Sequence, residues 1–161
     1  MKSILLLLLT VSLTVSSQTF QVENNSLLLP SEISFKPGTA VLTPESESAL
    51  KHVLAYLNQK DYISLIRVEG HVFTSQNDSV NLVLSQNRAL IVCKWLIMNG
   101  IDCKRLIAVG FGNYKPITDT NTPEGKTTNT RICFVNAEIR GRSIGGLPVD
   151  GSGIIAGDVC K

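Results

Sequence analysis

Apolar residues recur at helical spacing in two segments of the chain. The first segment has the i, i+3, i+4, i+7 pattern of an amphipathic helix packed on a sheet, at Leu50, Val53, Leu54 and Leu57. The preceding residues 43–45, Thr-Pro-Glu, provide an N-cap, a proline at the first helical position and an acidic first turn. A second helix is predicted from about residue 80 to residue 99, and Gly100 is suited to its C-terminal end.

Shorter stretches of alternating or continuous apolar residues indicate four β-strands. They are residues 32–35, 64–69, 106–109 and 131–139. Strands that alternate with helices predict an α/β (α+β) fold. We expect a sandwich of the βαβαβ type, in which two helices pack on one face of a mixed four-stranded sheet.

One arc of the second predicted helix combines apolar side chains with three polar ones. At 100° per residue, Arg88, Asn81 and Ser85 fall within this arc. A buried arginine needs a partner, because a desolvated unpaired charge is strongly destabilising. Either Arg88, helped by Asn81, binds a carboxylate from outside the chain, or it pairs internally with Glu69 or Asp78. The spacing alone leaves both interpretations open.

The beginning of the chain indicates export. Lys2 precedes an apolar run that starts at Ile4 and ends in small residues at Ser16 and Ser17, which is the pattern of a secretory signal peptide. A membrane span needs about 20 apolar residues, so we expect none in the mature chain. The predicted division is a signal peptide at 1–17, an N-terminal segment at 18–27, one domain at 28–140 and an extended or loose glycine-rich tail at 141–161.

Composition narrows the classes of function. Charged residues make up 17% of the chain and the net charge is +2, which is too little to attract nucleic acid by bulk electrostatics. Four cysteines in an exported chain favour at least one disulfide, and we expect Cys133 to pair with Cys160. His52 and His71 complete no zinc pattern, and no nucleophile is spaced with a base. We therefore expect no metal, no cofactor and no enzymatic activity.

A series of motifs runs through most of the chain. The most specific is Asn-x-x-Leu-Ser-x-x-Arg-Ala-x-x-Val at residues 81–92, which follows Gly70-His71 at a predicted strand end. The others are Ile33-Ser34-Phe35, Gly38-Thr39-Ala40-Val41-Leu42, Gly110-Phe111-Gly112 and Asn129-Thr130-Arg131-Ile132. In order and spacing they resemble the OmpA-like C-terminal domain, the peptidoglycan-associated family, over about residues 28–140.

The resemblance implies non-covalent binding of peptidoglycan through the diaminopimelate residue of its stem peptide. In that family, the arginine of the Arg-Ala pair binds a carboxylate of the ligand, and Arg88 matches it. Asn81 is the expected supporting contact, and Ser85 lies in the same half of the helix.

Two positions depart from the pattern of the family. The aspartate that closes the family's Gly-His-Thr-Asp binds the ammonium of the ligand, and Phe73 stands in its place. An aromatic face attracts an ammonium by a cation–π contact but cannot accept its hydrogen bonds. Asp78, later in the same loop, is a candidate substitute. Thr130 replaces the first arginine of the family's Asn-Arg-Arg, while Arg131 remains.

Two functions follow from these features. The first is a periplasmic protein, associated with the outer membrane or cell wall, that tethers an envelope component to peptidoglycan. The second is a protein–protein interaction module of an envelope assembly, with a degenerate wall-binding pocket in which Phe73 packs against another chain. The expected partners are peptidoglycan and outer-membrane or envelope proteins, and nucleic acid is not among them.

Overall fold

The computed structural model describes residues 19–74, 76–144 and 152–161. The predicted signal peptide, residues 1–17, lies outside the described residues. The helical elements, in chain order, are η1 (Pro44–Ser46), α1 (Glu47–Gln59), α2 (Asp78–Met98), η2 (Cys103–Arg105) and α3 (Pro123–Asn129). The strands are β1 (Val22–Glu23), β2 (Ser26–Leu27), β3 (Ile63–His71), β4 (Leu106–Gly112), β5 (Arg131–Ile139), β6 (Arg142–Ser143) and β7 (Ile154–Ile155).

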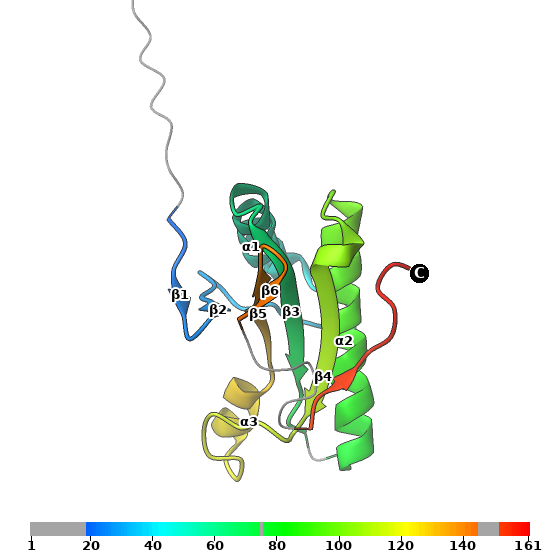
Figure 1. Ribbon diagram of the computed structural model, residues 1–161. Helices are drawn as coiled ribbons and strands as arrows, with labels where there is room; N and C mark the ends of the chain where they lie inside the picture. Colours follow the sequence, from blue (N-terminus) through cyan, green and yellow to red (C-terminus); the bar gives the residue numbers. More distant parts are fainter. Residues whose placement is uncertain (1–18, 75, 145–151) are drawn as a thin grey trace, which may run out of the picture.

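One mixed sheet forms the frame of the molecule (Figure 1). Its strand order is β1-β2-β5-β3-β4-β7, and β6 pairs with β5. β3 runs parallel to β4 and antiparallel to β5. The connection between the two parallel strands contains α2, as a parallel pair requires a long crossover. The α/β class and the mixed sheet predicted from the sequence are therefore confirmed.

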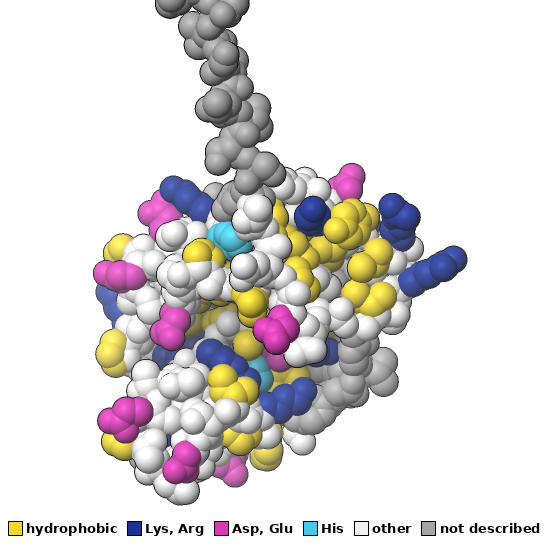
Figure 2. Space-filling view, turned by 90° about the vertical axis from the view of Figure 1, so that its left-hand side faces the viewer, with side chains coloured by type: hydrophobic (Ala, Val, Ile, Leu, Met, Phe, Trp, Pro, Cys, Tyr) yellow, Lys and Arg dark blue, Asp and Glu magenta, His cyan; other side chains and the backbone are white. Residues whose placement is uncertain are grey.

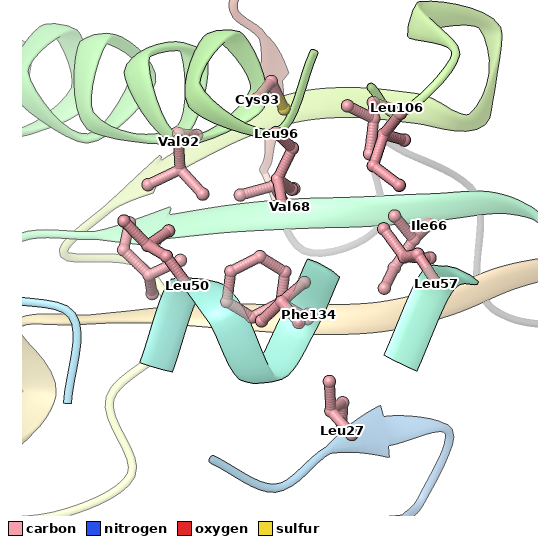
Figure 3. Packing of buried hydrophobic residues seen from close by; sticks show 14 of the residues in the cluster. Leu27, Leu50, Leu57, Ile66, Val68, Val92, Cys93, Leu96, Leu106 and Phe134 are labelled. Carbon is pink, nitrogen blue, oxygen red and sulfur yellow. The ribbon is translucent and has the colours of Figure 1, made fainter. Parts of the chain in front are cut away.

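The core lies between α1, α2 and one face of the sheet (Figure 3). The predicted inward face of α1 is confirmed at Leu50, Val53 and Leu57, which are buried, whereas Leu54 is only partly buried. Val68 and Phe134 are fully buried on the two central strands. Each such side chain contributes roughly 1.5–3 kcal/mol when it leaves water. The packing of the helices on one face is thus driven mainly by apolar burial.

Two glycines allow α2 to approach the sheet closely. A Cβ atom on Gly70 of β3 would collide with the backbone carbonyl of Ser85, and one on Gly110 of β4 would meet Gln86 and the Ser85 hydroxyl. The Ser85 hydroxyl in turn accepts a hydrogen bond of 2.9 Å from the backbone N–H of Gly112. These contacts hold α2, and with it the arginine one turn further along, in a defined place above the strands.

The prediction of a strand at residues 32–35 is wrong. Phe35 makes only an isolated bridge to Leu42, because the segment folds back on its own continuation through the turn at residues 36–41. The position beside β5 belongs to β2, which forms a hairpin with β1. Asn24 and Asn25 make the turn of this hairpin with φ angles of 49° and 63°, a conformation that asparagine tolerates.

Of the two alternatives for the tail, extended or loose, residues 152–161 follow the first. Residues 152–161 lie along the edge of the sheet, where Ile154 and Ile155 of β7 pair with β4 (Figure 1). Val159 is buried against the core. The reason is that the last residues contain apolar side chains that the glycines do not outweigh.

One disulfide joins this end to the rest of the domain. Cys103 and Cys160 are bonded, with their Cα atoms 5.3 Å apart. The expectation of a disulfide is confirmed, but the predicted pairing of Cys133 with Cys160 is wrong. Cys133 lies on β5, which β3 and β4 separate from the edge that carries the tail. Cys93 and Cys133 are free thiols.

Candidate functional site

A cavity of about 420 Å³ opens where four parts of the chain meet: the segment at residues 32–37, α2, α3 and the adjoining ends of β3 and β5. We call it the Arg88 pocket. It is lined by Glu32, Ile33, Ser34, Phe35, Pro37, Phe73, Arg88, Lys126, Thr127, Thr130 and Arg131. Figure 2 looks at the side of the molecule that carries β1, β2 and α3, and shows a hollow with basic and hydrophobic side chains around it. The space suits a ligand group of several heavy atoms.

Arg88 is the central cation of this pocket. Its side chain is anchored by a hydrogen bond of 2.9 Å from Nε to the backbone carbonyl of Thr39. The guanidinium carbon lies 4.7 Å from the centroid of the Phe35 ring, in a cation–π contact. Burial lowers the pKa of Arg88 from its ordinary value, and the group remains protonated at neutral pH. Arg88 is thus held in place as a charged donor.

The terminal nitrogens of Arg88 have no acid of the described chain beside them. Of the two internal partners that the sequence allowed, Glu69 is paired with Arg67 and His71. Asp78 accepts a hydrogen bond of 2.7 Å from the side-chain amide of Asn113. Neither Nη atom of Arg88 has a hydrogen-bond partner among residues 19–74, 76–144 and 152–161. Two donors in a fork therefore remain available to a carboxylate.

Positive charge exceeds negative charge around the pocket. Three cations line it, Arg88, Lys126 and Arg131, against one acid, Glu32, which gives a balance of +2 from three positive charges and one negative. Arg131 already donates to the backbone carbonyls of Asn129 and Lys115, at 3.0 and 3.2 Å. The ammonium of Lys126 makes no such bond within the described residues. The site is therefore electrostatically suited to an anionic group.

Phe73 forms part of the wall of the same pocket. Its side chain is 6% exposed, and its backbone N–H donates a 3.0 Å hydrogen bond to the Thr130 hydroxyl. That hydroxyl also donates to the carbonyl of Lys126, at 2.9 Å. Thr130 thereby connects the end of β3 to α3. Thr130, which stands where the family has an arginine, therefore has a structural role in the wall of the cavity.

The other three predicted site residues lie outside the lining of the Arg88 pocket. Asn81 is fully buried, and its side chain bonds Thr74 at 2.6 Å and the carbonyl of Gln76 at 3.3 Å. It therefore shapes the loop that follows Phe73. Ser85 fastens α2 to the sheet. Asp78, in the first turn of α2, accepts a hydrogen bond from the Asn113 side chain.

The pocket contains residues that reasoning from the sequence did not single out. Glu32 and Lys126 line it, although they come from segments far apart in the chain. Their types carry no signal by themselves, because an isolated glutamate or lysine is most often a solvated surface residue. Only the folded arrangement reveals them.

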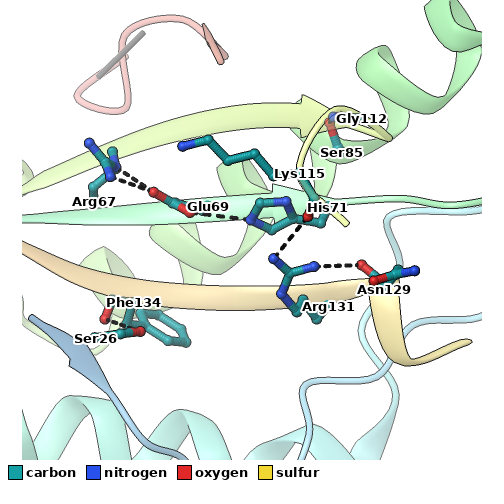
Figure 4. A network of polar contacts seen from close by, with 10 residues as sticks. All are labelled: Ser26, Arg67, Glu69, His71, Ser85, Gly112, Lys115, Asn129, Arg131 and Phe134. Atoms are coloured by element: carbon teal, nitrogen blue, oxygen red, sulfur yellow. Dashed lines mark hydrogen bonds and ion pairs between the residues drawn. The ribbon is translucent and has the colours of Figure 1, made fainter. Parts of the chain in front are cut away.

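A buried polar network occupies the face of the sheet away from α1 and α2 (Figure 4). Arg67 donates to Glu69 at 2.7 Å from Nε, and His71 lies 3.2 Å from the other oxygen of Glu69. Burial alone would raise the pKa of Glu69, but the hydrogen bond of His71 and the charge of Arg67 lower it. Burial lowers the pKa of His71, and its bond to Glu69 offsets only part of this. His71 is therefore a neutral structural residue at neutral pH.

The described part of the chain contains no candidate metal site. No group of three histidine, cysteine, aspartate or glutamate side chains there is arranged to hold a metal ion. Likewise, no helix among those residues is long and apolar enough to cross a membrane.

Comparison with known proteins gives the family. The family model described as the OmpA family matches residues 34–130. The chain therefore belongs to the OmpA family, and the resemblance noted from its motifs is confirmed.

Individual relatives share the domain but not the whole length. The probable lipoprotein YiaD of Escherichia coli strain K12 is 32% identical over 117 residues, which are 72% of this chain and 52% of YiaD. The peptidoglycan-binding protein ArfA of Mycobacterium tuberculosis strain H37Rv is 31% identical over 70 residues, 44% of this chain and 22% of ArfA. This chain thus spans about half the length of YiaD.

The solved structures include the cell wall anchor of the T6SS from Pseudomonas aeruginosa. It is 26% identical and superposes with a TM-score of 0.56, covering 65% of this chain and 75% of that one. The agreement supports the arrangement of helices and strands described above.

Proposed function

We propose that this domain binds peptidoglycan non-covalently and tethers an envelope component to the cell wall. The observation that carries the proposal is the pair of Nη atoms of Arg88, which have no partner among the described residues. They belong to the lining of a cavity of about 420 Å³ whose charged side chains sum to +2. An arginine whose Nε is already anchored still presents its two Nη atoms as an end-on bidentate site for a carboxylate. The ligand group is therefore an acid.

The names of two similar proteins support a wall ligand. ArfA is named a peptidoglycan-binding protein, and the structure from Pseudomonas aeruginosa is titled a cell wall anchor. The acids of peptidoglycan are the carboxylates of its stem peptides. Among these we propose the diaminopimelate residue, whose free end presents a carboxylate to Arg88 and an ammonium beside it.

The roles within the pocket follow from the contacts. Arg88 is the carboxylate anchor, and Phe73 supplies an apolar wall whose ring can face the ammonium. Asn81 and Ser85 act indirectly, because their side chains bond the protein rather than the cavity. Asp78 is bonded to Asn113, so we assign it no contact with the ligand.

The same proposal places the protein in the bacterial envelope. YiaD is named a probable lipoprotein, and other relatives are named outer-membrane proteins. We propose export to the periplasm through the apolar leader at residues 1–17, with attachment to the outer membrane through a partner or through the wall itself.

A pulldown with purified sacculi of the diaminopimelate type tests the proposal. We expect Arg88→Ala to weaken binding at least about 10-fold, because hydrogen bonds to charged groups contribute roughly 1.5–3 kcal/mol each. Arg88→Lys keeps the charge without the fork and should bind at an intermediate level. Phe73→Asp adds a carboxylate for the ammonium and should strengthen binding.

The control variant is Arg142→Ala, which removes the same charge from an exposed strand outside the pocket. It should bind as the wild type does, and circular dichroism should show all variants folded. If no variant and no wild-type protein sediments with sacculi, the wall ligand is refuted and the interaction module becomes the better description.

A further inference from the structure

Glu32 is the one acidic side chain that lines the Arg88 pocket within the described residues. It is exposed, and it has no hydrogen bond or ion pair with any described residue. Three cations share the lining with it, yet none of them pairs with it. A carboxylate in this position is free to receive a positively charged group of a ligand.

The backbone that carries Glu32 is held in place. Ile33 is buried in the core, and the backbone N–H of Ser34 donates a 2.9 Å hydrogen bond to the Ser46 hydroxyl. The Ser46 hydroxyl donates back to the carbonyl of Ser34, at 2.8 Å. The side chain of Glu32 therefore starts from a fixed point on the wall that also presents Phe35 beneath Arg88.

Glu32 also lies where two cavities adjoin. It lines a second cavity, of about 360 Å³, together with Ile33, Thr130 and Arg131, which are shared with the Arg88 pocket. The rest of that second cavity is mainly apolar, with Leu27, Leu28, Leu29, Pro30 and Ile132 among its lining residues. A ligand that reaches from Arg88 into the shared part of the lining meets both an acid and a cation there, because Glu32 and Arg131 line both cavities.

We infer that Glu32 is the residue that receives the ammonium of a zwitterionic ligand whose carboxylate is bound by Arg88. The inference rests on the function proposed above and concerns the specificity of that site. Phe73 offers no acceptor for the hydrogen bonds of an ammonium. Asp78 is bonded to Asn113 and lies outside the lining. Glu32 is thus the acid that the pocket itself provides.

Paired ligands separate this role from a general effect of charge. The first probe is a soluble stem tripeptide that ends in meso-diaminopimelate. The second is the same tripeptide ending in 2-aminopimelate, which keeps the distal carboxylate and lacks the distal ammonium. Isothermal titration of both with wild type, Glu32→Gln and Glu23→Gln measures the contribution. Glu23 is an exposed acid of β1 outside the pocket and serves as the matched control.

We expect Glu32→Gln to lower the affinity for the diaminopimelate peptide about 3- to 10-fold, because it removes a charge-assisted hydrogen bond at a partly solvated site. The 2-aminopimelate peptide should bind this variant and the wild type equally. Glu23→Gln should change neither affinity.

Two results overturn the inference while the proposed function stands. The first is that the wild type binds the two peptides with equal affinity. The second is that Glu32→Gln changes the affinity for neither peptide, or lowers the affinity for both by the same factor. Wild-type protein that binds neither the tripeptides nor sacculi overturns the proposed function as well.

Discussion

Removal of the Cys103–Cys160 disulfide is predicted to destabilise the domain by about 4 kcal/mol. The bond closes a loop with a sequence separation of 57 residues. Loop-closure entropy of the unfolded chain grows as 1.5R ln n plus a constant, which gives about 14 cal/mol/K, or about 4 kcal/mol at 25 °C. For a domain of this size the melting temperature should fall by on the order of 10 °C.

The measurement is urea denaturation of the wild type and of the double variant Cys103→Ser/Cys160→Ser. The denaturant slope should increase in the double variant, because its unfolded chain is no longer cross-linked and exposes more surface. Cys133→Ser is the matched control, since it removes a free thiol and leaves the disulfide intact. A loss below about 1 kcal/mol in the double variant, or an equal loss in the control, would refute the entropic reasoning.

Three further predictions concern the core and the buried polar network. Gly70→Ala should cost several kcal/mol of unfolding free energy or prevent folding, because its Cβ would meet the backbone of Ser85; a normal denaturation midpoint would contradict this. Burial raises the pKa of Cys93 to about 12, so iodoacetamide at pH 8 should label this thiol only after unfolding, as mass spectrometry of native and denatured protein would show. The pKa of His71 is lowered below its ordinary 6.5, so the unfolded chain takes up the proton first as pH falls; unfolding free energy should decrease from pH 7 to pH 5, and less steeply in His71→Gln.

The regular elements were predictable because their signals are local. The inward face of α1 is an apolar stripe at helical spacing, and Gly100 adopts the positive φ of 97° that its place after α2 requires. β5 alternates buried and partly buried residues along most of its length, whereas β3 is buried on both faces from Ile66 to His71. The edge of the sheet was not predictable in the same way, because residues 32–35 alternate like a strand. The Asn24-Asn25 turn was the local signal that could have revealed the hairpin at residues 22–27.

Of the residues that line the candidate site, the sequence indicated Arg88 but few of its neighbours. The mixed arc of α2 pointed to Arg88, but a helical wheel cannot tell which part of an arc faces the sheet and which faces a cavity. Asn81 and Ser85 therefore looked like Arg88, although their polar atoms satisfy the backbone of neighbouring segments. The disulfide depended on which edge of the sheet the tail would follow, and strand order is a property of the whole fold.

The anchoring of Arg88 has a consequence for the thermodynamics of recognition. A flexible arginine loses rotamer freedom when it binds a ligand, at a cost of about 0.5–1.5 kcal/mol. Here the Thr39 carbonyl and the Phe35 ring have already restricted the side chain in the empty protein. Most of that entropic penalty is therefore met during folding, so Arg88 is already ordered for the carboxylate that we propose it binds.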